Sequence, residues 1–287
     1  LRNTPPNVTN VTFSPVAGGW GEVYTFTVAL EDLQNDDVNC SLYISSDNQT
    51  WEYRGSSILP EGNGNCTVNV TDFTCAEMGQ KYFLFQIDDG TPENLMNTSS
   101  YLGPYIDRDN ITVEYVQGNW SIANRSGDQY TTFVLRIFDN DTGNYVPAGV
   151  NTTLWITHNI TDFDSGHYLQ TNDSGYITYE FNPNCTPIEY KIGPQYWFGE
   201  INDGCYEKLN TTNFTTFVYG DLISTIDQPT GNKYLRGTTI ALRASILDDC
   251  SNSITDAQGN FTVVNEDGTS YDCGAVSYTH LTLPTKA

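Results

Sequence analysis

The sequence predicts an all-β protein built from antiparallel β-sandwiches in tandem, and two observations carry this prediction. Apolar residues alternate with polar ones in short segments such as Phe133, Leu135 and Ile137, which indicates a strand with one buried face. Turn-forming residues follow at short intervals, as in residues 139–144. Short alternating strands separated by such turns are typical of a sandwich.

The length of 287 residues exceeds that of one sandwich, which takes about 100 residues, so we expect two to three domains. We place them at residues 1–115, 116–220 and 221–275. The last range is too short for a complete sandwich and is interpreted as a truncated module. The strands expected in these modules are 24–30, 42–44, 83–87 and 111–115, then 131–137, 153–157, 177–181, 188–192 and 214–219, then 240–246 and 261–264.

The charge balance excludes several partners. The chain has 12 Lys+Arg against 35 Asp+Glu and a net charge of -23. Such a field repels nucleic acid and anionic membrane surfaces, and it favours counter-cations such as calcium. No apolar run approaches the length of a membrane span, so we expect none in this sequence.

Glycosylation acceptors are unusually dense. Of the 28 asparagines, 18 stand in an N-x-Ser/Thr triplet, which predicts an extracellular protein that carries covalent N-linked glycans. Such glycans would also cover exposed strand edges. The alternative is a Thr/Asn-rich β-protein that never meets a glycosyltransferase. The acceptor positions are Asn7, Asn10, Asn39, Asn48, Asn65, Asn69, Asn97, Asn110, Asn119, Asn124, Asn140, Asn151, Asn159, Asn172, Asn184, Asn210, Asn213 and Asn260.

Seven cysteines in a hydrophilic chain indicate disulfides and an oxidising compartment. No Cys-x-x-Cys occurs, so zinc ribbons and thioredoxin-type sites have no support. Connectivity does not follow from sequence, and Cys40 is the odd cysteine that can replace either partner in the first module. The pairs favoured by short spacing are Cys66–Cys75, Cys185–Cys205 and Cys250–Cys273.

The first module resembles the immunoglobulin-like or cadherin-like repeats of microbial surface proteins. The matching features are the opening Pro5-Pro6-Asn7-Val8, the acidic loop 31–37 and the strand that ends in residues 88–90. In cadherin-like modules such loops bind calcium between domains. The resemblance therefore implies calcium as the one cofactor to consider, with candidate ligands Asp36, Asp37, Asp88 and Asp89; the alternative is solvated turn carboxylates.

The second module resembles bacterial immunoglobulin-like domains of the invasin type, through residues 146–150 and 171–178. This implies a spacer in a stalk or surface layer. Residues 196–198 (Tyr-Trp-Phe) read as a core strand, with a carbohydrate-stacking platform as the alternative. Asp139 and Asp141 lack the glutamate that an EF-hand loop needs and are interpreted as part of a turn.

The C-terminal residues 276–285 resemble one translated reading frame of a transposase-based sequencing adapter. We therefore expect residues 276–287 to be a tail of non-native origin and the source to be an uncultured microbe. The dense acceptor triplets point to an archaeon.

Catalytic motifs are absent from the sequence. His158 and His167 flank Asp162 and Asp164, but further metal ligands at recognisable spacing are missing. No nucleophile elbow, phosphate loop or metalloprotease motif occurs. We do not expect an enzyme.

The leading hypothesis is a structural glycoprotein of the cell surface that self-assembles as a homopolymer into an archaeal surface layer (S-layer), sheath or filament. The rival hypothesis is an adhesin or receptor stalk that binds glycans or other cells; an exposed aromatic face at Trp197 or Trp51 would favour it. A third makes these modules accessory domains of a large exoenzyme.

Overall fold

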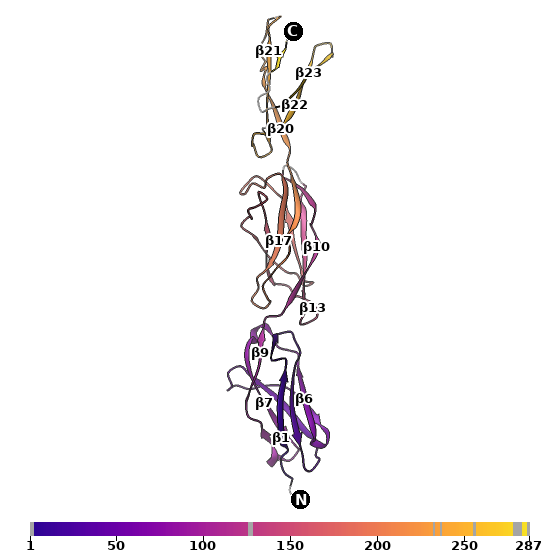
Figure 1. Ribbon diagram of the computed structural model, residues 1–287, viewed down its shortest axis with the longest axis vertical. Coiled ribbons are helices and arrows are strands. Elements are labelled where there is room, and N and C mark those ends of the chain that lie inside the picture. Colours follow the sequence, from indigo (N-terminus) through magenta and orange to yellow (C-terminus); the bar gives the residue numbers. More distant parts are fainter. Residues whose placement is uncertain are drawn as a thin grey trace.

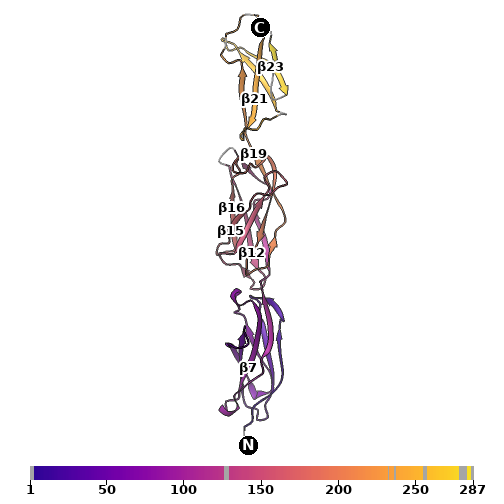
Figure 2. The same ribbon diagram turned by 90° about the vertical axis from the view of Figure 1, so that its left-hand side faces the viewer.

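The structure is a computed structural model that describes residues 3–125, 129–231, 233–235, 237–254, 257–277 and 283–285. It confirms an all-β fold. Three modules follow one another along a single long axis, with the N-terminus at one end (Figures 1 and 2). The helices of the described residues are short 3-10 turns, and none is long or apolar enough to cross a membrane. They are η1 (Pro60–Gly62), η2 (Cys75–Glu77) and η3 (Pro92–Asn94).

The first module consists of two sheets that pack against each other. One sheet has the strand order β1 (Asn7–Ser14), β3 (Tyr24–Glu31), β6 (Gly64–Val70). The other has the order β2 (Ala17–Gly19), β9 (Tyr101–Asp107), β7 (Gly79–Asp88), β4 (Val38–Ser45), β5 (Glu52–Leu59), with β8 (Met96–Asn97) beside β7.

Alternation explains this core. In β3 the residues Tyr24, Phe26, Val28 and Leu30 are buried while those between them are half-buried. In β7 the same pattern points Phe83 inward from the opposite sheet, where its ring packs edge-on to Phe26 at 5.0 Å between centroids. The strands predicted at 24–30, 42–44 and 83–87 are confirmed.

The second module repeats this plan. Its first sheet holds β10 (Ile111–Gln117), β12 (Thr131–Asp139), β13 (Asn144–Tyr145) and β16 (Tyr176–Phe181). Its second sheet has the order β11 (Ser121–Asn124), β19 (Phe214–Tyr219), β17 (Gly193–Ile201), β14 (Asn151–Ile156), β15 (His167–Gln170), with β18 (Leu209–Asn210) beside β17.

Two expectations need correction here. Residues 111–115 were assigned to the first module, but β10 pairs with β12, with Ile111 opposite Asp139, so the boundary lies between β9 and β10. Alternation alone does not tell which module a strand joins. The sheets are also not wholly antiparallel, since β2 runs parallel to β9, and β11 parallel to β19.

The third module contains two small sheets. One pairs β20 (Leu222–Gln228), β21 (Ile240–Asp248) and β24 (Leu283–Thr285), and the other pairs β22 (Gln258–Val264) with β23 (Ser270–Ser277). The strands predicted at 240–246 and 261–264 are confirmed. Of the tail interpreted as adapter-derived, residues 278–282 and 286–287 lie outside the described residues.

The disulfide pairs differ from those that the short spacings favoured. Cys273 is a free cysteine, and Cys40 is not the odd one. The disulfides found among the described residues are Cys40–Cys66, Cys75–Cys205 and Cys185–Cys250.

The two longer disulfides connect consecutive modules. Cys75 lies in η2 of the first module and Cys205 follows β17 of the second; their Cα atoms are 5.2 Å apart. Cys185 precedes β17 and Cys250 follows β21 of the third module, with a Cα separation of 5.4 Å. Pairing by short spacing was wrong because modules stacked end to end bring the loops of facing poles together, whatever their distance in sequence.

All 18 predicted acceptor asparagines are accessible. Fourteen side chains are exposed, and the other four, at Asn39, Asn119, Asn124 and Asn159, are half-buried. Their glycosylation stays a prediction.

Candidate functional site at the module junctions

Each module has a buried aspartate where an inner strand of its core ends. These residues are Asp32 after β3, Asp139 at the end of β12 and Asp248 at the end of β21, and each is at most 4% exposed. In all three, the carboxylate accepts a hydrogen bond from the backbone N–H two residues further along, at 3.1, 2.9 and 3.0 Å. The aspartate thus closes the turn at the pole of its module.

At the first junction two more carboxylates join this aspartate. Asp109 comes from the link between β9 and β10, and Asp141 from the turn after β12. One oxygen from each of Asp109, Asp139 and Asp141 lies within 4.8 Å of the others. We call this group the junction triad.

A glycine-rich turn of the first module covers the junction triad. The backbone N–H of Gly21 donates to Oδ1 of Asp109 at 2.7 Å. A Cβ on Gly19 would come within 2.3 Å of a carboxylate oxygen of Asp141 and 2.4 Å of one of Asp109, so a larger residue would have to displace these side chains. Trp20 lies between these two glycines in the sequence. Its Nε1 donates to the carbonyl of Cys205 at 2.9 Å and anchors the turn on the second module.

The junction triad is short of positive charge. None of the ion pairs found among the described residues involves its three aspartates. Burial, reinforced by the neighbouring Asp139 and Asp141, raises the pKa of Asp109 to about 8. Burial and Asp139 also raise the pKa of Asp141. Asp109 is fully buried, and its Oδ2 has no hydrogen-bond partner.

At the second junction an arginine occupies the acidic pole. The fully buried guanidinium of Arg125, which follows β11, lies 3.0 and 3.1 Å from the two carboxylate oxygens of Asp249 through Nε. Its Nη2 lies 2.5 Å from Asp248, and Nη1 donates to the carbonyl of Tyr190 at 2.9 Å. One guanidinium of the second module therefore pairs with both aspartates of the third and offsets one of their two negative charges.

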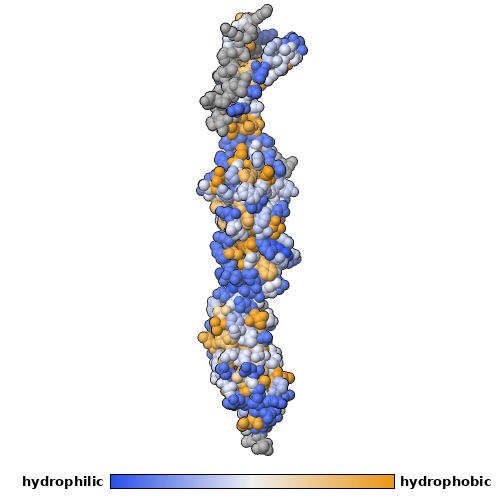
Figure 3. Space-filling view, turned by 45° about the vertical axis from the view of Figure 1, so that its right-hand side comes forward, coloured by the Kyte–Doolittle hydropathy of each residue, from blue (hydrophilic) through white to orange (hydrophobic). Residues whose placement is uncertain are grey.

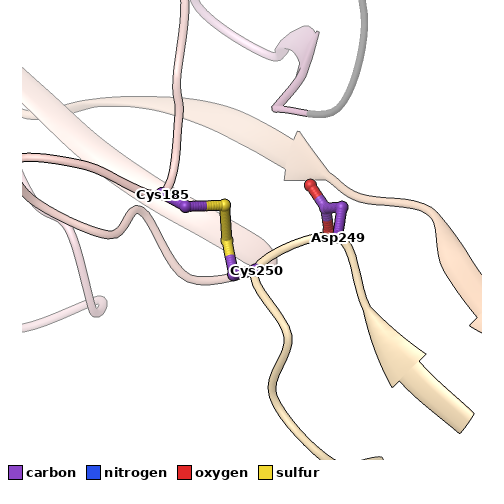
Figure 4. A group of neighbouring side chains, drawn as sticks. All are labelled: Cys185, Asp249 and Cys250. Carbon is purple, nitrogen blue, oxygen red and sulfur yellow. A yellow bond between two sulfur atoms is a disulfide. The ribbon is translucent and has the colours of Figure 1, made fainter.

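Cys185, Cys250 and Asp249 also lie together at this junction (Figure 4). The two sulfur atoms form a disulfide, so they offer no thiolate to a metal ion. This group is a covalent link and not a metal centre.

The four aspartates predicted as calcium ligands do not form a site. No three of them have ligand atoms within 4.8 Å of one another. Their carboxylates accept hydrogen bonds from the protein backbone: Asp37 accepts from Glu61, 24 residues away in sequence, and Asp88 accepts from Gly90 in a local turn. The acidic loop of the first module lies at its N-terminal pole, whereas the junction triad lies at the opposite end of that module.

Trp197 and the two histidines singled out in the sequence serve the fold of the second module. Trp197 is fully buried and stacks on Phe133 at 4.3 Å between ring centroids, so it is no carbohydrate platform. The Nε2 of His167 donates to a carboxylate oxygen of Asp164 at 2.8 Å, and Tyr190 donates to the same oxygen at 2.8 Å. His158 meets Asp162 only through backbone atoms, because its N–H donates to the Asp162 carbonyl.

Comparison with known proteins gives little further information. No family model matches the chain, and no curated protein matches it. Among solved structures it is similar to a DUF4785 family protein from Legionella pneumophila, with 10% sequence identity and a TM-score of 0.28. The match covers 70% of this chain and 54% of that protein, so the chain spans about half its length. A likeness this weak supports no argument about function.

Proposed function

We propose that this chain is a structural segment of an extracellular glycoprotein, a stiff rod that assembles into a surface layer, sheath or filament. The observation that carries the proposal is that each pair of consecutive modules is joined twice, by the chain and by a disulfide. An adjustable linker between domains needs no such second connection. Two connections at each junction suit a spacer whose modules must keep a fixed relative orientation.

The surface is consistent with this role. Hydrophobic residues are scattered in small groups among hydrophilic ones on the face that Figure 3 shows. The accessible acceptor asparagines are distributed over all three modules, so glycans would coat the rod along its length. The immunoglobulin-like character of the modules and the archaeal source are part of this proposal and rest on the sequence resemblance and on acceptor density.

Of the two tryptophans that would favour an adhesin, Trp51 is half-buried and Trp197 is not exposed. Trp197, which would have anchored a glycan, lies in the core of the second module. We therefore favour assembly over glycan binding.

Electron microscopy tests the assembly directly. Antibodies against this chain would locate it in the native envelope or extracellular fraction of cells that carry the gene. We expect labelled lattices, tubes or fibres with a repeating subunit that fits the three-module rod. Labelled single stalks or soluble particles would contradict the proposal and favour an adhesin.

Small-angle scattering tests the stiffness. We expect the maximum dimension of the oxidised chain to change little with ionic strength, and its distribution of distances to broaden when Cys75 and Cys205 are both replaced by Ser. A double variant of the intramodular pair, Cys40→Ser with Cys66→Ser, serves as control because it leaves both junctions linked. Equal broadening in both variants would contradict a stiffening role of the disulfides at the junctions.

A further inference from the structure

Positions at the two junctions correspond to one another through the register of the β-strands. Gly19 of β2 pairs with Asp107, the last residue of β9, and Asn124 of β11 pairs with Tyr219, the last residue of β19. The next residue along the chain is Trp20 in the first case and Arg125 in the second. These two residues therefore occupy equivalent positions.

The following modules align in the same way. The backbone N–H of Asn140, which follows the buried Asp139, donates to the carbonyl of Asn110 at 2.9 Å. The backbone N–H of Asp249, which follows the buried Asp248, donates at 3.1 Å to the carbonyl of the residue that precedes β20. Each acceptor is the last linker residue before the first strand of its module.

The charges at these equivalent positions differ. At the second junction Arg125 supplies a cation between two aspartates. At the first junction the same position holds Trp20, whose indole turns away to Cys205 and packs edge-on to Tyr206 at 5.9 Å. Moreover, the linker position of Asp109 corresponds to Gly220 at the second junction, so the first junction gains a carboxylate where the second has no side chain.

We propose that the junction triad binds a hard divalent cation of the calcium class, which takes the place that the guanidinium of Arg125 fills at the next junction. Three carboxylates converge there, and the buried Oδ2 of Asp109 lacks a partner.

The donor set selects the class of cation. It consists of oxygen atoms only, without His or Cys in the group, which suits calcium and magnesium rather than zinc or copper. Calcium is favoured over magnesium because it accepts irregular geometry and several protein carboxylates, whereas magnesium keeps most of its water. The cation would tie together the linker and the turn after β12, beneath the glycine-rich turn of the first module.

Isothermal titration of the chelator-treated full chain tests this proposal, with calcium and magnesium as separate titrants. We expect one calcium site that Asp141→Asn weakens at least tenfold, because the amide still accepts from Asn110 but loses its charge. Asp36→Asn is the matched control: like Asp141→Asn it replaces a hydrogen-bonded carboxylate by an amide, but in the first module and outside the triad, so it should leave calcium affinity unchanged.

Three results would overturn the proposal. They are the absence of calcium binding to the wild-type chain, equal weakening by the two variants, and magnesium binding as tight as calcium binding. Hydrogen exchange of the unmodified chain gives a second readout that needs no variant. Calcium should slow amide exchange at least tenfold in residues 108–111 and 139–142 and leave residues 248–252 unchanged, since Arg125 already serves that junction. Equal slowing at both junctions, or at neither, would also contradict the proposal.

Discussion

Replacing Arg125 by methionine tests whether the second junction depends on its internal cation. The substitution keeps much of the side-chain volume and removes the charge. It leaves Asp248 and Asp249 without the guanidinium that lies within 3.1 Å of both. It also removes the donor to the Tyr190 carbonyl.

The expected effect is large because water does not reach these groups. The side chain of Arg125 is 0% exposed, and those of Asp248 and Asp249 are 6% and 8% exposed. Removing one partner of such a buried pair costs about 3–5 kcal/mol, since the remaining charges stay buried. At about 1.4 kcal/mol for each factor of ten, amide exchange in β21 should accelerate by roughly two to four orders of magnitude.

Hydrogen exchange of β21 peptides, followed by mass spectrometry, is the suitable assay. The five tryptophans lie at or before residue 197, so their fluorescence does not report on the third module. Arg136→Met is the control, because that half-buried guanidinium lies over the rings of Tyr145 and Tyr176, at 3.2 and 4.5 Å, within the second module. Each such cation–π contact contributes about 0.5–1 kcal/mol.

If Arg125→Met changes β21 exchange no more than Arg136→Met does, the guanidinium does not stabilise the junction and our reasoning is wrong. Adding Asp249→Leu to Arg125→Met should restore part of the lost protection, because one of the uncompensated charges is then removed.

Two further predictions concern the core of the second module. Trp197→Ala should lower its free energy of unfolding by about 3–5 kcal/mol in a urea titration, because the indole is fully buried; a loss below 1 kcal/mol would mean that it packs poorly. Although burial raises the pKa of Asp164, hydrogen bonds from His167, Tyr190 and the backbone lower it below its ordinary value overall. The carboxylate therefore stabilises the fold above the unfolded-state pKa of about 4, and this contribution is lost as pH falls through the lower folded-state pKa. Asp164→Asn should cost about 1–3 kcal/mol at pH 7 and less at pH 3, and an equal cost at both pH values would contradict this assignment.

Periodicity predicted most strands, because alternation records which face of a strand is buried. The strand expected at residues 188–192 is wrong, since these residues form no strand and β17 begins at Gly193. Phe133, Leu135 and Ile137 were expected to face inward and are fully buried. The same argument favoured a core position for Trp197 over a surface platform, and the structure agrees.

The junctions could not be predicted, because their residues come together only when two modules meet. Residues 139–144 were correctly interpreted as a turn, and Asp139 accepts the hydrogen bonds that such a turn requires. What the sequence did not reveal is that the linker brings Asp109 to the same place. The sequence offered one signal for this pole. In each of the three modules an aspartate stands at the end of the corresponding strand.

The overlap of the two disulfides at the junctions limits how far the protein can be stretched. Cys75 pairs with Cys205 and Cys185 with Cys250, so the shortest covalent path from residue 75 to residue 250 runs along only the 20 residues from 185 to 205. Fully extended at about 3.4 Å per residue, that path measures roughly 70 Å, against roughly 600 Å for the uncrosslinked chain. Under tension, unfolding of the second module would release almost no slack until a disulfide is reduced.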